Sequence, residues 1–277
     1  MGGEVWRAVG HAAGTYRRLI GIQIRSQLEY RASFFLDLLG TAVTALAGFG
    51  TLALIMQRFE GIAGWTLGQV AFLYGMVEMA FGTMDMLFSG FDYDTFGPLV
   101  QRGRFDQLLL RPVEITVQVL GSQFALRRLS RIAQGVAVFV FALSLVDVRW
   151  TLAKIAYLPL VFVGQVGFFG GLFIIGSTTT FWTVQRLEVL NIFTYGGTEM
   201  MSYPMHIYHR SMRRFFTYVI PAIFLNYYPA LYILDKPDPL HGPSFAPFLA
   251  PLVGLGVLAL ALAFWRFGIR YYQGTGT

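Results

Sequence analysis

The sequence predicts an all-α polytopic membrane protein with six transmembrane helices, and three observations support this prediction. Hydrophobic residues make up 55% of the chain and charged residues only 13%, whereas soluble domains carry about 25% charged residues. The mean hydropathy is +0.56. Apolar runs that are long enough to cross a bilayer, which takes roughly 20 residues, recur along the 277 residues.

The segment before the first span, residues 4–31, is predicted to form an amphipathic helix on the inner membrane interface. Its arginines are interleaved with apolar residues, as in helices that lie in the plane of a membrane. An alternative is that this helix also contacts a cytoplasmic partner. The segment has no apolar core before a small-residue cleavage site. We therefore expect the N-terminus to stay inside, with the first span as its own insertion signal.

Five segments have the length and composition of transmembrane helices. They are residues 32–57, 66–88, 132–148, 155–181 and 245–267. The region between the last two is aromatic and apolar but is interrupted by charges and prolines. We interpret it as a further span at 184–203 followed by a broken outer hairpin at 205–234, with helix breaks at Pro204, Pro221 and Pro229. The competing interpretation places the span at 215–234, and both give six crossings.

The distribution of arginine indicates the orientation. With the N-terminus inside, most basic residues fall in the inner segments, and the positive-inside rule then places both termini in the cytoplasm. The cluster Arg210, Arg213 and Arg214 opposes this trend, because it falls in the predicted outer hairpin.

The inner segment 89–131 contains a compact basic element, LVQRGRFDQLLLRP, at Leu99–Pro112. Gly103 permits a tight bend, and Pro112 restricts the residue before it and marks an element boundary. The element is either a juxtamembrane helix on anionic lipid or a docking element for a cytoplasmic partner. For docking we expect Leu108–Leu110 to provide an apolar anchor. The candidate docking residues are Arg102, Gly103, Arg104, Phe105, Asp106, Gln107, Leu108 and Arg111.

Acidic residues within spans are functional candidates, because a charge in lipid is costly. Glu78 lies near the middle of the second span, and Asp85 follows two turns later on the same helix face. With Glu199, these residues line either a translocation path or a subunit interface. The alternative is a hydrogen bond between helices that only fixes their packing. Glycines in the first and fourth spans likewise indicate close helix packing, either within the chain or at a dimer seam.

Several kinds of chemistry are absent from the sequence. It contains no GxxxxGK[ST] phosphate-binding loop, no HExxH metal motif, no GxSxG nucleophile motif and no cysteine. His206 and His209 are an i, i+3 pair, which is more often structural than metal-binding. We expect no catalytic residue, no metal and no cofactor on this chain. The net charge of +6 is explained by anionic lipid head groups without a nucleic acid partner.

The order of these elements resembles that of the permease subunits of type-2 (ABC-2) ATP-binding-cassette exporters, and in particular daunorubicin-type efflux permeases. The most specific pieces are RGRFDQLLLRP, the YP, IP and YYP pattern at 203–234, and the ending YYQGTGT. The resemblance covers essentially the whole chain, as a single transmembrane domain over residues 1–277.

The resemblance implies roles for the segments. The element around residues 102–112 would be a coupling helix seated on a separate nucleotide-binding subunit, residues 4–31 a connecting helix, and the hairpin a re-entrant closure of the exit. Two P-loop ATPase subunits, which would hold ATP and Mg²⁺, and a second permease, identical or related, would complete a complex in the bacterial plasma membrane.

The expected function is therefore export of a hydrophobic or amphipathic compound, driven by ATP on the partner. The main alternative is a proton-coupled secondary transporter that uses Glu78 and Asp85. A lipid-modifying enzyme and a membrane scaffold are further alternatives; the former would need a nucleophile or metal cluster, which the sequence does not show.

Overall fold

The computed structural model describes residues 2–29, 31–58, 61–183 and 192–273. Within these ranges the chain forms helices and connections and no strand. Five helices are long and apolar enough to cross a membrane, or up to six if a bent helix pair near the C-terminal third counts as one span. The prediction of an all-α polytopic membrane protein is thus confirmed.

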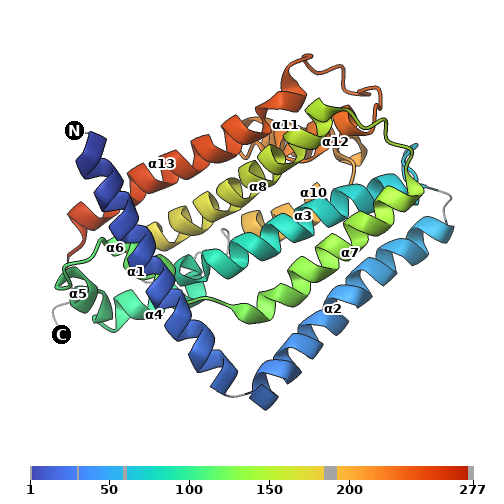
Figure 1. The fold of residues 1–277 in the computed structure, drawn as a ribbon. Coiled ribbons are helices and arrows are strands. Elements are labelled where there is room, and N and C mark those ends of the chain that lie inside the picture. The colour runs from blue at the N-terminus through green and yellow to red at the C-terminus, as the bar shows by residue number, and fades with distance from the viewer. Residues whose placement is uncertain (1, 30, 59–60, 184–191, 274–277) are drawn as a thin grey trace.

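The first two helices lie at the edge of the molecule. Helix α1 (Gly2–Glu29) crosses one end of the bundle, and α2 (Arg31–Arg58) runs along its side, so the two form a V (Figure 1). Most of the apolar side chains of α2 that are described remain exposed, among them Leu36, Leu39 and Val43. Helix α2 is therefore a span with little protein around it.

The core is built on α3 (Leu67–Leu87), which is antiparallel to α7 (Leu129–Leu145) and parallel to α8 (Leu152–Thr179). Helix α3 begins with a capping box, in which Thr66 and Gln69 satisfy each other's backbone N–H groups. Its apolar residues are almost all buried. The last span, α13 (Ala250–Tyr271), packs along α8.

Glycines allow two of these helix pairs to approach closely. A Cβ atom at Gly135 of α7 would overlap the backbone of Met79 in α3, and one at Gly254 of α13 would overlap the backbone of Gly164 in α8. The glycines of the fourth span therefore serve packing within the chain. In α2, by contrast, a Cβ atom at Gly40 or Gly50 would meet no described residue within 4 Å.

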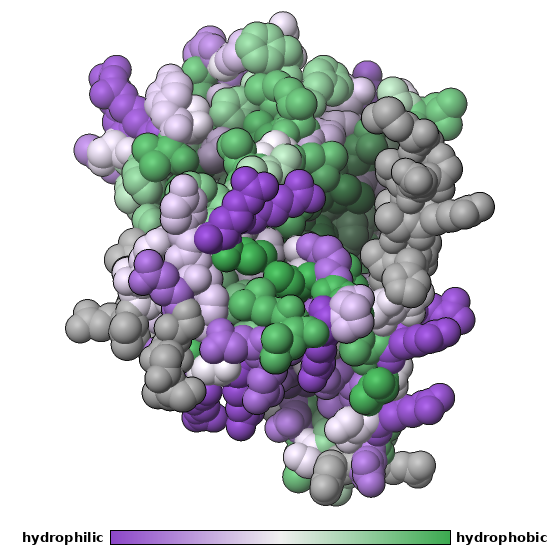
Figure 2. All heavy atoms as spheres, turned by 90° about the vertical axis from the view of Figure 1, so that its left-hand side faces the viewer, coloured by the Kyte–Doolittle hydropathy of each residue, from purple (hydrophilic) through white to green (hydrophobic). Residues whose placement is uncertain are grey.

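One end of the bundle carries the segment between α3 and α7. It consists of η1 (Ser89–Phe91), α4 (Tyr93–Gln101), α5 (Arg104–Leu109), α6 (Ile115–Ser122) and η2 (Leu126–Arg128). Helix α1 and the end of α13 lie at the same end (Figure 1). Figure 2 faces this end and shows hydrophilic side chains around a central hydrophobic area.

The described chain resumes after α8 with η3, a π-helical turn at Ile192–Gly196, and α10 (Gly197–Met201). Residues 184–191 of the predicted span at 184–203 lie outside the described residues. The predicted hairpin follows as η4 (Met205–Ile207), α11 (Arg210–Tyr218), η5 (Ala222–Phe224) and α12 (Tyr227–Ile233).

The hairpin bends by 80° between α11 and the segment Ala222–Ile233. Pro221 lies at this bend and Pro204 immediately precedes η4, so both interrupt helices as expected. Pro229 differs from the expectation: it lies in the first turn of α12, where a backbone N–H would have no helical partner. The last span begins close to the predicted position, at Ala246: a 3₁₀ turn, η6 (Ala246–Leu249), leads directly into α13, and the two together extend to Tyr271.

Candidate functional site

The candidate docking element is held to the bundle by one aromatic side chain. Gly103 adopts a left-handed conformation with φ of 66° between α4 and α5, which glycine tolerates without strain. The turn directs Phe105 into the core, where it is fully buried. Its ring contacts four others, those of Phe96, Phe181, Trp265 and Tyr272. These rings join α4, the end of α8 and the end of α13, so α5 cannot move without these spans.

The outer surface of this element is basic, and one apolar side chain, Leu110, protrudes from it. Arg102, Arg104, Gln107 and Arg111 are exposed, and Leu110 has 86% of its surface exposed. Of the expected apolar anchor at Leu108–Leu110, Leu108 packs against the core, whereas Leu109 and Leu110 face outward. Phe105 and Leu108 thus hold the element to its own chain, and Leu109 and Leu110 remain at the surface.

Asp106 is half-buried beside the C-terminal end of α13. Burial, together with this nearby carboxylate, raises the pKa of Tyr272. Asp106 therefore interacts with Tyr272 of its own chain.

The turn between α5 and α6 is fixed by hydrogen bonds. The buried Gln118 amide donates to the carbonyl oxygens of Leu108 and Val113, at 3.1 and 2.7 Å. The indole of Trp265 donates to the hydroxyl of Thr116 at 3.2 Å. The Trp265–Thr116 hydrogen bond thus connects this segment to α13, as the aromatic rings do.

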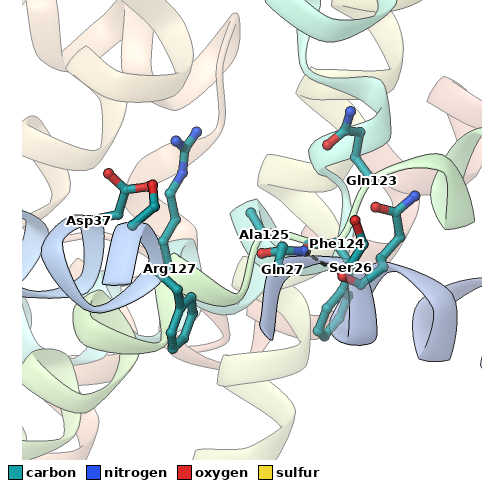
Figure 3. Close-up of a pocket in the computed structure, with 10 residues that line it drawn as sticks. Ser26, Gln27, Asp37, Gln123, Phe124, Ala125 and Arg127 are labelled. Carbon is teal, nitrogen blue, oxygen red and sulfur yellow. Dashed lines mark hydrogen bonds between the residues drawn. The ribbon is translucent and has the colours of Figure 1, made fainter. Parts of the chain in front are cut away.

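Helix α1 is hydrogen-bonded to the end of the segment between α3 and α7, at residues 122–126. Gln23 donates to the carbonyl of Ser122, and Gln27 donates to the carbonyl of Phe124 and accepts from the backbone N–H of Leu126. These contacts border a pocket of about 450 Å³ between α1, α2 and residues 123–127. In Figure 3, Asp37 and Arg127 lie next to each other on one side of it.

The acidic residues of the second span are paired. Arg131 of α7 makes a two-pronged contact with Glu78, with Nε 2.5 Å from Oε2 and a terminal nitrogen 2.9 Å from Oε1. One turn earlier, where α7 begins, Nε of Arg128 lies 2.8 Å from Oδ2 of Asp85. Both carboxylates are buried. Glu78 and Asp85 lie two turns apart on α3. Their partners, Arg128 and Arg131, belong to the predicted inner segment 89–131.

The first of these pairs borders a polar pocket of about 540 Å³ between α2, α3, α7 and the segment around α10. Glu78, Arg128 and Arg131 line it together with Glu199, whose side chain is exposed there. Thr41, Thr44 and Gly48 of α2 form another wall. Two of the three candidates for a translocation path, Glu78 and Glu199, therefore line one cavity, whereas the third, Asp85, contacts Arg128 of the cavity wall.

At the opposite end, the hairpin is tied to the bundle. The buried Asn226 donates to the carbonyl oxygens of Leu73 and Met201, at 3.1 and 2.8 Å, and pairs with Gln165. Lys154 forms an ion pair with Asp235 at 2.7 Å. His206 contacts Tyr227 and the Ala63 carbonyl through its two ring nitrogens, and His209 caps α11.

The candidate docking element lies at one end of the bundle, a polar pocket lies along one side, and the hairpin lies at the other end. The family model described as "ABC-2 family transporter protein" matches residues 42–276. The chain belongs to the ABC-2 transporter family. No curated protein and no solved structure matches it significantly. The resemblance seen in the sequence is confirmed at the level of the family, and the chain is the permease type of subunit of an ABC transporter.

Several residues of this ABC-2 permease were not identified from sequence as site residues. Arg128 and Arg131 were counted only as inner charges, and Asn226 and Gln165 were not considered. One signal was present: an i, i+3 arginine pair at the start of one span and an i, i+7 acid pair on another fit two antiparallel helices. Nothing local marks Asn226, because its partners come from three other helices.

Proposed function

We propose that this chain is the transmembrane subunit of an ATP-driven exporter of a hydrophobic or amphipathic compound, driven by a separate nucleotide-binding subunit in the bacterial plasma membrane. The observation that carries the proposal is the docking element 102–111. Its exposed leucines and arginines face outward, while Phe105 connects it rigidly to the ends of α8 and α13. A movement of a partner bound to this surface would therefore be transmitted to α8 and α13.

Export needs a path, and the polar pocket beside α2 supplies the candidate. It is lined by charged and hydroxyl side chains within the span region. One side of α2 is uncovered along its apolar length. A second permease, identical or related, would cover this side and enclose the pocket between two copies. The spans would then have two arrangements, one with the path open and one with it closed. The partner ATPases would shift the equilibrium between them.

The rival function, a proton-coupled carrier that uses Glu78 and Asp85, is less well supported. Each of the two acids has an arginine within 3 Å. Buried ion pairs of this kind indicate that Glu78 and Asp85 hold the helices together. Any further role would require α3 and α7 to separate.

The proposal is tested by purifying the tagged chain from its native membrane with its co-purifying proteins. We expect a P-loop ATPase in near-equal amount. The variant Leu110→Asp should lose the ATPase about tenfold or more, because a charge would enter an apolar contact. Leu152→Asp is the matched control, since Leu152 is 83% exposed at the start of α8, at the opposite end of the bundle.

Two results would contradict the proposal. One is a stable chain without any ATPase. The other is equal loss of the ATPase with Leu110→Asp and Leu152→Asp at unchanged expression, which would mean that residues 102–111 do not form the docking surface.

A further inference from the structure

The Arg210, Arg213 and Arg214 cluster has no role in the function proposed above. It lies on α11, whose sequence RSMRRFFTY divides into two faces. Phe216 is buried in the core, and the ring of Phe215 lies 5.7 Å from that of Phe193. At helical spacing the three arginines fall on the other face with Thr217. The fold therefore presents three positive charges within little more than one turn.

These arginines line one wall of a pocket of about 510 Å³ between α11 and residues 240–249. The other walls include aromatic side chains, Phe224, Tyr228 and Phe245. Among the described residues the three ion pairs within 4 Å are Arg128–Asp85, Arg131–Glu78 and Lys154–Asp235, so none of them involves this cluster. The nearby acid Asp238 accepts hydrogen bonds from the backbone N–H groups of Leu240 and Gly242.

The surroundings place this pocket at the level of a membrane interface. Tyr218 is 82% exposed and Phe245 is 60% exposed on its rim, as are the aromatic side chains that lie at the head-group level of membrane proteins. The first turn of the last span, with Leu249 in the pocket wall, begins beside it. A ligand here would meet charge on one side and apolar rings on the other.

We propose that this pocket binds the phosphate head group of an anionic phospholipid, with the three guanidinium groups on the phosphate and the aromatic rings along the upper acyl chains. Clustered like charges repel one another, and a bound phosphate ester removes this repulsion through charge-assisted, often two-pronged hydrogen bonds. Such a lipid would fill the pocket between α11 and the last span. The proposal concerns binding alone and does not depend on ATP-driven export.

The test measures binding of dioctanoyl phosphatidylglycerol to the purified full chain in a neutral detergent by native mass spectrometry. Dioctanoyl phosphatidylcholine, glycerol 3-phosphate and inorganic phosphate are the comparison ligands. We expect phosphatidylglycerol to bind best. The double variant Arg213→Gln/Arg214→Gln should weaken this binding by about tenfold or more, because each charge-assisted hydrogen bond to an ion contributes more than a neutral one.

The matched control is Arg58→Gln/Arg149→Gln. It removes the same net charge from exposed positions at the same end of the molecule, and it should leave the preference unchanged. The variant Arg213→Lys/Arg214→Lys should fold and retain part of the preference, since it keeps the charge and loses only the planar fork. Unfolding temperatures of all variants show whether a loss of binding reflects a loss of fold.

Three outcomes would overturn the proposal. Equal binding of the anionic and zwitterionic lipids would remove the role of net charge. Equal binding of glycerol 3-phosphate or inorganic phosphate would identify a site for soluble phosphate. Equal losses in the Arg213/Arg214 and Arg58/Arg149 variants would show general electrostatic attraction in place of a site.

Discussion

At the scale of single residues, the buried acids of the second span are neutralised by partners that lie far away in sequence. Glu78 and Arg131 are 53 positions apart and make two contacts. The guanidinium of Arg131 also lies 4.3 Å from the ring centre of Phe81, a favourable cation–π distance. A charge that is buried alone would be very costly, so each of these residues stabilises the chain only through the other.

We therefore expect a double-mutant cycle at this pair to be strongly non-additive. Glu78→Gln or Arg131→Gln alone should destabilise the permease by about 3 kcal/mol, because each leaves one charge buried without its partner. The double variant should be more stable than the sum of the single effects predicts. Thermal unfolding in detergent measures all four forms. Additive effects would mean that the two side chains do not form the pair described.

At the scale of elements, glycine positions decide which helices pack within the chain and which remain free. On α13, Gly254 lies against the backbone of Gly164, whereas a Cβ atom at Gly256, two residues later, would meet no described residue within 4 Å. The same helix thus has one side facing α8 and another facing outward. Interactions between spans in lipid depend on such close approach, since apolar side chains gain nothing by leaving one apolar medium for another.

Replacing each of these two glycines with valine separates the packing effect from the intrinsic cost of the substitution. Gly254→Val should lower the free energy of unfolding by about 1–3 kcal/mol or more, because its Cβ would overlap the α8 backbone. Gly256→Val should have little effect. Unfolding temperatures of the two variants provide the comparison, and equal stability would show that α8 and α13 are not in close contact.

At the scale of the whole molecule, the fold has two distinct ends. The docking element, α1 and the end of α13 form one, and the hairpin with the Lys154–Asp235 pair forms the other. At this second end, Lys236 reaches across to the carbonyl of Gly64 and to Gln69. Partial burial lowers the pKa of Lys236. The contacts that hold the chain together at its two ends are thus made by different segments.

The orientation can be tested directly because the chain contains no cysteine. Single cysteines at Leu110 and Tyr218, which are 86% and 82% exposed, report on the two ends. In intact cells a membrane-impermeant maleimide should label Tyr218→Cys and not Leu110→Cys. Inverted membrane vesicles should show the reverse. Labelling of both from one side would refute an outer hairpin.

The association of two permeases can be tested in the same cysteine-free background. Leu36 on α2 and Leu260 on α13 are similarly exposed, at 69% and 72%. We expect Leu36→Cys to form cross-linked dimers with a related or identical copy and Leu260→Cys to remain uncross-linked, because α2 borders the polar pocket and α13 does not. Gel electrophoresis after mild oxidation measures both, and preferential cross-linking through Leu260 would place the interface elsewhere.

The sequence by itself determined the class of this protein. Hydropathy and length were sufficient for the helices α2, α3, α7, α8 and α13, because a lipid environment selects for long apolar runs whatever their neighbours are. The sequence also located the turn that begins the candidate docking element, since the bend at Gly103 is a local feature.

Only the tertiary structure decided which residues meet. Pairing of Glu78 with Arg131, the ring cluster around Phe105 and the contacts of Asn226 each join segments that are distant in the chain. It also assigned the glycines of α8 to packing within the chain and left Gly40 and Gly50 of α2 open among the described residues. Local patterns report how a residue suits its helix and the membrane, whereas contacts depend on how whole helices are placed against one another.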